Sequence, residues 1–134
     1  MPDANHPLNA AALLLGRLLL ASLFIIDGWG KIGSYAAAVG YMESFGIPGA
    51  LLPLVILTEV GCGLCIALGW QARLAALALA GFAISAALIF HHNFAVRNEV
   101  LHFQKDLAIA GGFLVLFVFG PGAWSLEGWV SKQP

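Results

Sequence analysis

The chain has 134 residues, of which 60% are hydrophobic and 10% are charged, whereas a globular domain is roughly half apolar and about a quarter charged. At a mean hydropathy of +0.90, one core of this size cannot bury all the apolar side chains, so much of the surface must face lipid. The net charge of −1 excludes a basic surface for nucleic acid. The composition therefore predicts a single domain embedded in a membrane.

Four apolar stretches are long enough to cross a bilayer, which takes about 20 residues at about 1.5 Å per residue. They cover approximately residues 8–27, 51–69, 74–90 and 101–120. The last one ends at Gly120-Pro121-Gly122, because proline and glycine stop a helix. Each stretch is rich in Leu, Ala and Ile and lacks the alternation of membrane β-strands. We therefore expect an all-α, integral membrane four-helix bundle.

The segment between the first two spans predicts a short interfacial helix. Apolar side chains recur there at helical spacing, at Tyr35, Ala38, Val39, Met42 and Phe45, and polar ones lie on other faces. Glycines at positions 33, 40 and 46 loosen this pattern, so an irregular loop is the alternative. The second and third spans are linked only by Trp70-Gln71-Ala72-Arg73, which makes them an antiparallel hairpin.

Four spans place both termini on one side of the membrane and the two longer loops on the other. The loop side then collects most of the charged and imidazole groups, namely Asp27, Lys31, Glu43, His91, His92, Arg97, Glu99, His102, Lys105 and Asp106. We expect these groups to form a polar rim over the bundle. Lys and Arg residues are nearly balanced between the two sides, so the positive-inside rule does not orient the chain.

Two charged residues, Arg17 and Glu59, lie deep within the first and second spans. A lone charge near the bilayer midplane costs at least about 2.5–3.5 kcal/mol, so each is expected to turn inward and find a partner. The simplest arrangement is an Arg17–Glu59 pair inside the bundle. Such a pair fits two roles equally well: a structural lock between helices, or a site that binds a ligand or handles protons.

Histidines mark the end of the third span and the start of the fourth. His91 and His92 face His102, Lys105 and Asp106 in the predicted bundle. Imidazoles beside a carboxylate can shuttle protons, ligate a metal or bind a quinone carbonyl. Haem ligation is disfavoured, because histidines near helix ends are more often solvated, and no clustered metal-ligand spacing is present. The Lys105 ammonium can also extend toward lipid headgroups.

Cys62-Gly63-Leu64-Cys65 has the spacing of thiol-disulfide enzymes. It lies inside the second span, whereas redox cysteines need thiolate stabilisation and access. Small residues at these positions instead let another helix approach closely. Packing is therefore the preferred role of the two cysteines over redox chemistry.

Several short motifs follow one another in a fixed order along the chain. They are Arg17, Gly28-Trp29-Gly30-Lys31, Tyr41-Met42-Glu43-Ser44-Phe45-Gly46-Ile47-Pro48, Glu59 with Gly69, Phe90-His91-His92-Asn93-Phe94, Gly120-Pro121-Gly122 and Ser125-Leu126. In this order they resemble the DoxX family of small bacterial inner-membrane proteins, particularly its YphA-like branch. The resemblance covers nearly the whole chain.

The resemblance implies a multi-pass protein of the bacterial inner membrane, with Arg17, Lys31 and Glu59 as family-matching polar positions and an interior that opens toward the polar rim. Some family members are linked to quinone-dependent oxidation and to redox stress. The implied ligand is therefore a quinone-like or other small amphipathic molecule, and the protein would be at most a membrane component of a quinone-linked oxidoreductase. The alternative is a structural or assembly subunit without chemistry, which docks a membrane protein partner or a second copy in the lipid bilayer. A solute carrier is disfavoured, because no span shows a broken-helix pattern.

Overall fold

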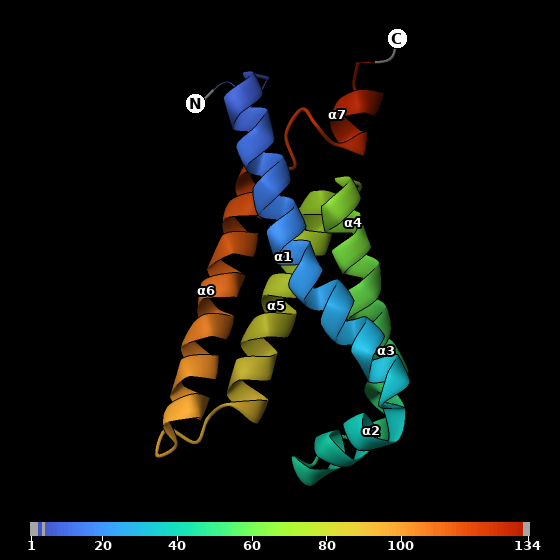
Figure 1. Cartoon of the computed structure of the whole chain (residues 1–134), viewed down its shortest axis with the longest axis vertical. Helices are drawn as coiled ribbons and strands as arrows, with labels where there is room; N and C mark the ends of the chain where they lie inside the picture. Colours follow the sequence, from blue (N-terminus) through green and yellow to red (C-terminus); the bar gives the residue numbers. More distant parts are fainter. Residues whose placement is uncertain (1–2, 4, 133–134) are drawn as a thin grey trace.

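The computed structural model describes residues 3 and 5–132, and these form helices joined by short connections (Figure 1). Four helical segments are long and apolar enough to cross a membrane. They are α1 (Pro7–Gly33), the composite second span (Gly49–Leu68), α5 (Ala72–Phe90) and α6 (Arg97–Phe119). The second span comprises η1 (Gly49–Leu51), α3 (Leu52–Ile56), η2 (Leu57–Cys62) and α4 (Gly63–Leu68). The predicted all-α four-helix fold is confirmed.

The first span extends further than the sequence suggested. The predicted limit was Asp27, but α1 stays helical to Gly33. Glycine weakens a helix because its backbone loses more conformational entropy on folding than that of any other residue. At Gly28, however, an added Cβ would lie 2.8 Å from Val60 Cγ2, so the absence of a side chain lets the second span pack directly against α1. This close packing keeps the glycine-containing segment in the helix.

The interfacial helix is confirmed as α2 (Tyr35–Ser44), and the irregular loop is thereby excluded. It follows α1 after Ser34 and lies across the lower end of the bundle in Figure 1. Met42 is the buried residue of this helix, which shows that its apolar face points into the bundle. A last short helix, α7 (Leu126–Val130), lies at the opposite end, beside the start of α1. We call these two ends of the bundle the loop side and the terminal side.

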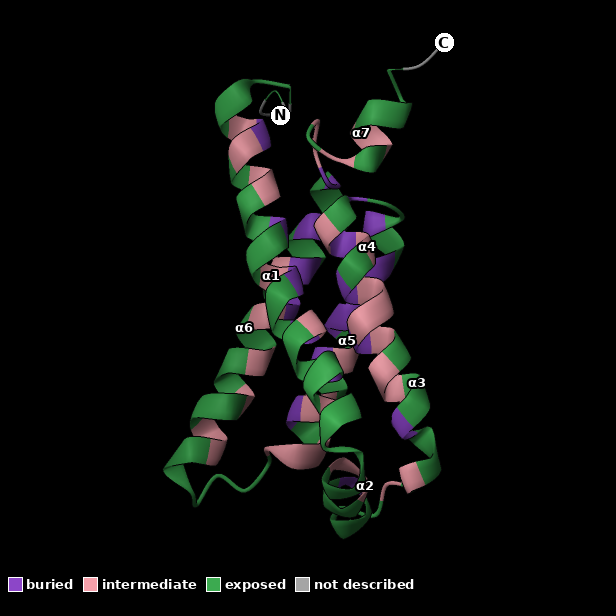
Figure 2. Cartoon of the chain, turned by 45° about the vertical axis from the view of Figure 1, so that its right-hand side comes forward, coloured by how far each residue is buried: buried purple, intermediate pink, exposed green. Residues whose placement is uncertain are grey.

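The helices form two pairs, one of α1 with the second span and the other of α5 with α6. The pairs meet toward the terminal side and diverge toward the loop side (Figure 1). The core lies where they meet, and Phe24 contacts the rings of Phe82 and Phe113 edge to face at centroid distances of 6.1 and 5.5 Å. Figure 2 shows the buried residues gathered along the centre of the bundle.

Apolar side chains also cover the outside of the bundle. In each span, at most 33% of the most apolar stretch is buried, and residues such as Leu19, Ile26 and Leu74 are largely exposed. In water an apolar surface of this extent would promote aggregation. A lipid environment accounts for it, as the composition predicted.

Candidate functional site

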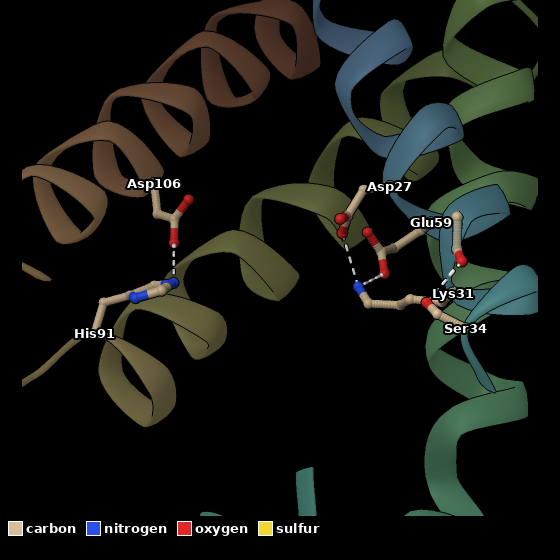
Figure 3. A network of polar contacts seen from close by, with 7 residues as sticks. Asp27, Lys31, Ser34, Glu59, His91 and Asp106 are labelled. Carbon is tan, nitrogen blue, oxygen red and sulfur yellow. Dashed lines mark hydrogen bonds and ion pairs between the residues drawn. The ribbon is translucent and has the colours of Figure 1, made fainter. Parts of the chain in front are cut away.

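A cavity of about 420 Å³ lies in the loop-side half of the bundle, between the two diverging helix pairs. Its walls come from α1, α2, the second span, α5 and α6. The volume falls in the range of about 300–1,000 Å³ typical of small-molecule sites. Most of the lining is apolar, and charged groups are placed on two opposite walls (Figure 3).

The first wall carries a three-residue ionic cluster, Asp27–Lys31–Glu59. Lys31 Nζ donates to Asp27 Oδ2 at 2.7 Å, one helical turn earlier in α1, and also to Glu59 Oε1 of the second span. Glu59 is only 1% exposed. A buried carboxyl group without a partner is strongly unfavourable, so the contact with Lys31 offsets part of the cost of burying Glu59 inside the bundle.

Glu59 belongs to a π-helical turn, η2. In a π-helix the hydrogen bonds run from residue i to i+5, and such turns are frequent at functional sites. An added Cβ on Gly28 would lie 2.9 Å from Glu59 Cβ, so the backbone of α1 passes directly beside this turn. The missing side chain at Gly28 thus brings Glu59 within reach of Lys31, three residues further along α1.

The predicted Arg17–Glu59 pair is wrong. Arg17 Nη1 instead donates to the carbonyls of Ile66 and Ala67 at 3.2 Å, and Nη2 donates to the carbonyl of Trp124. The reason is helix register. Gly28 faces Glu59, and Arg17 lies eleven residues earlier in the same helix, about 16 Å away along the axis. Arg17 therefore lies outside the cavity, although it is 2% exposed.

The second wall is built around His91, at the end of α5. Its Nδ1 lies 3.1 Å from Glu99 Oε2 and its Nε2 lies 3.9 Å from Asp106 Oδ2. The His102 ring stacks on the His91 ring with a centroid distance of 4.9 Å. Glu99, His102 and Asp106 recur at spacings of three and four residues, so they share one face of α6. The imidazole is held between two carboxylates and a second imidazole.

The remaining candidates divide between the cavity and the surface. Lys105 lines the cavity, whereas His92 is exposed and does not. Two residues that complete the networks, Asp27 and Glu99, belong to the predicted polar rim but not to the predicted site. For Asp27 the sequence does contain a sign of this role. Asp27 stands four residues before Lys31, which is the spacing of an ion pair on one helix face.

An aromatic cluster fixes α2 over the loop-side opening of the cavity. The Tyr41 ring stacks on Phe90 of α5 at 5.3 Å, and Phe45 contacts both rings at 5.1 Å. Burial and the Glu99 carboxylate raise the pKa of Tyr41. The phenol is therefore neutral at physiological pH and keeps its O–H as a hydrogen-bond donor.

Cys62 and Cys65 are free thiols that pack against the hydrophobic core. This arrangement fits the packing role, since a thiol in apolar surroundings is not activated as a thiolate. Within residues 3 and 5–132, no group of three or more His, Cys, Asp or Glu side chains is arranged to hold a metal ion.

Comparison with known proteins identifies the family. Residues 12–92 match the DoxX family model, and this range holds both the Asp27–Lys31–Glu59 cluster and His91. The chain belongs to the DoxX family. The chain is also 48% identical to the inner membrane protein YqjF of Escherichia coli K12, over 94% of this chain and 97% of that protein.

A second relative, the inner membrane protein YphA of the same organism, is 35% identical over 86% of this chain and 87% of its own length. No solved structure matches the chain. Both relatives are inner membrane proteins and the chain has four candidate spans, so this DoxX protein is a multi-pass inner-membrane protein. The comparisons thus confirm the resemblance and the localisation.

Proposed function

We propose that the cavity binds a quinone-like ligand, a small molecule with an apolar ring and carbonyl oxygens at opposite ends, as an accessory to redox metabolism in the membrane. The observation that carries this proposal is the pairing of an apolar cavity with polar clusters on two opposite walls. A quinone ring carries its two carbonyl oxygens at opposite ends, so each oxygen would face one of the two polar clusters.

The apolar part of the cavity suits the ring of such a ligand. Phe24, Phe82 and Phe90 contribute aromatic surface, and Leu23 and Val55 contribute aliphatic surface. Burying apolar ligand surface against these side chains is favourable by about 25 cal/mol per Å². A pocket that is mostly apolar with a few fixed polar groups is the common form of small-molecule sites.

The Lys31 ammonium supplies the donor on the first wall. It has three N–H groups, and Asp27 and Glu59 accept two of them. No residue in the described part of the chain accepts the third. A carbonyl oxygen in the cavity would complete the coordination of the ammonium, and its two carboxylate partners would hold the side chain in place for that contact.

Binding is tested with the purified protein in detergent and a short-chain ubiquinone analogue, followed by tryptophan fluorescence against empty micelles. We expect saturable binding that weakens at least about tenfold in Lys31→Met, because a hydrogen bond from a charged donor contributes about 1.5–3 kcal/mol. Lys132→Met is the matched control, since Lys132 lies on the terminal side outside this cavity. Absence of saturable binding, or equal affinity in Lys31→Met, would contradict the proposal.

One observation favours the alternative of a structural or assembly subunit. Gly16, Gly81 and Gly111 face open space, with no atom within 4 Å of an added Cβ. Small residues on a lipid-facing surface let a further helix approach closely. Under this alternative Gly81→Leu, on the outer face of α5, would abolish recovery of a partner or second copy after cross-linking in membranes, while quinone binding would be absent.

A further inference from the structure

At the second wall of the cavity, His91 and Asp106 line the cavity and Glu99 lies behind His91. The hydrogen bonds of this group cannot all be made while the His91 ring is neutral. His91 lies between the carboxylates of Glu99 and Asp106. An ionised carboxylate only accepts hydrogen bonds, and a neutral imidazole carries one N–H and one bare nitrogen. A neutral His91 can therefore donate to only one of its two carboxylates.

The distances indicate which contact is made. Nδ1 lies 3.1 Å from Glu99 Oε2, within hydrogen-bond range, so we assign the N–H of the neutral ring to Nδ1. Nε2 lies 3.9 Å from Asp106 Oδ2, which is too long for a hydrogen bond. In the neutral state Nε2 is then a bare lone pair beside a carboxylate, on the cavity wall.

A carbonyl oxygen cannot bind at a bare Nε2, because both atoms are acceptors. A proton on Nε2 turns the ring into an imidazolium with two donors. Its Nε2–H can then donate to a ligand oxygen, while Glu99 and Asp106 neutralise the added charge. The other titratable and charged groups facing this site are His102 and Lys105 of α6, Tyr41 of α2 and Asp27 of α1. Asp27 is the one carboxylate among these four, and it is paired with Lys31 on the opposite wall, so it does not take over the position of Glu99.

The group also has access to water. His91, Glu99 and Asp106 are 21%, 28% and 18% exposed at the side chain, whereas Glu59 on the opposite wall is 1% exposed. Glu99 is in the first turn of α6, nearest the loop side, and Asp106 stands two turns further into the bundle. A proton from the loop side can thus reach Nε2 without crossing the apolar core.

Resting on the proposed function, we infer that Glu99, His91 and Asp106 form a proton-linked carbonyl site, in which binding of the ligand's oxygen takes up one proton from the loop side onto His91 Nε2. Glu99 is a positioning residue, because it holds Nδ1 as a donor and directs Nε2 toward the cavity. On the opposite wall the Lys31 ammonium, which already carries its three N–H donors, binds the other oxygen.

The experiment is calorimetric titration of the purified protein with the short-chain ubiquinone analogue, in buffers of different ionisation enthalpy and over a range of pH. We expect uptake of about one proton per ligand at pH values where His91 is neutral in the free protein, and there the dissociation constant rises about tenfold per pH unit. Both His91→Gln and Glu99→Gln should bind with little pH dependence, the first because the titrating ring is gone and the second because the ring can reverse its tautomer.

His92→Gln is the matched control, since His92 is the adjacent residue but is exposed, and it should keep the full proton linkage. Circular dichroism of each variant checks that the helices are retained. Saturable binding without proton uptake, or unchanged linkage in His91→Gln and Glu99→Gln, would overturn this inference and leave the quinone proposal standing. Absence of binding at every pH would remove both.

Discussion

Among single residues, the two deeply buried ionisable side chains, Glu59 and Arg17, have different kinds of partner. Glu59 pairs with a lysine side chain at the cavity, whereas Arg17 donates to backbone carbonyls at the end of α4 and in the segment before α7. The last carbonyls of a helix lack partners within the helix and carry a partial negative charge. The Arg17 guanidinium therefore caps α4 and joins the terminal segment to the bundle.

Removing this guanidinium should destabilise the protein more than removing an exposed one. Arg17→Met leaves the carbonyls of Ile66, Ala67 and Trp124 without a donor, at an expected cost of about 3 kcal/mol. Arg17→Lys should recover only part of the loss, because one ammonium cannot reproduce the planar fork. Thermal unfolding in detergent measures the effect, with Arg97→Met as the exposed control. Equal melting temperatures for Arg17→Met and Arg97→Met would disprove this role.

At the scale of helices, glycines set how α1 packs on the second span. An added Cβ would lie 2.8 Å from Val60 Cγ2 at Gly28 and 2.8 Å from Ile25 Cγ1 at Gly63. These two contacts, from opposite helices, fix the register that places Glu59 beside Lys31 and leaves Arg17 beside the end of α4. Small residues at such positions let membrane helices approach closely.

The two glycines of the Gly28-Trp29-Gly30 motif should therefore respond in opposite ways to alanine. Gly28→Ala forces α1 away from η2 and should cost about 1–3 kcal/mol, with weaker ligand binding because Glu59 moves from Lys31. Gly30→Ala meets no atom within 4 Å and should be neutral or stabilising by about 0.5–1 kcal/mol, since alanine favours the helix. Unfolding and binding assays on both variants provide the measurement, and a loss of stability in both would contradict the assigned packing.

Hydropathy and turn residues were sufficient to predict the four spans, α2 and the end of α6 at Phe119, because each depends on local sequence. The partner of Arg17 was not predictable in this way. It depends on the relative position of two helices along their axes. In addition, the predicted limit of the first span at Asp27 left Lys31 outside the helix to which it belongs. The π-helical turn at Glu59 also has no simple sequence signature. The presence of each helix was thus easier to predict than its exact limits, which for α1 and α6 extend to Gly33 and back to Arg97, or the contacts between helices.

For the whole molecule, the fold implies a simple topology. The start of α1 and α7 lie at one end, and α2 and the connection between α5 and α6 lie at the other (Figure 1). The chain crosses the membrane four times between its two termini, which is an even number. Residues near the two termini should therefore be accessible from the same face of the membrane. Positions before the start of α6 should be accessible from the opposite face.

Single cysteines test this arrangement in a background with Cys62→Ala and Cys65→Ala. Asn5→Cys and Ser131→Cys should react with a membrane-impermeant maleimide from one face of the membrane, and Asn93→Cys from the other. Labelling intact cells and inverted vesicles also reveals which face is periplasmic. Reaction of Asn5→Cys and Asn93→Cys from the same face would exclude the four-span topology.

Because the two helix pairs diverge, the packed core and the charged walls of the cavity lie in different halves of the bundle. The aromatic contacts of Phe24, Phe82 and Phe113 lie where the pairs meet, whereas the charged walls lie where they diverge. A small hinge motion about the packed half would change the width of the cavity greatly and the buried core area very little. A cavity of variable width would accept molecules of different bulk at nearly constant stability. Phe24 and Phe82 belong both to the core and to the cavity lining, so substitutions there would change stability and selectivity together.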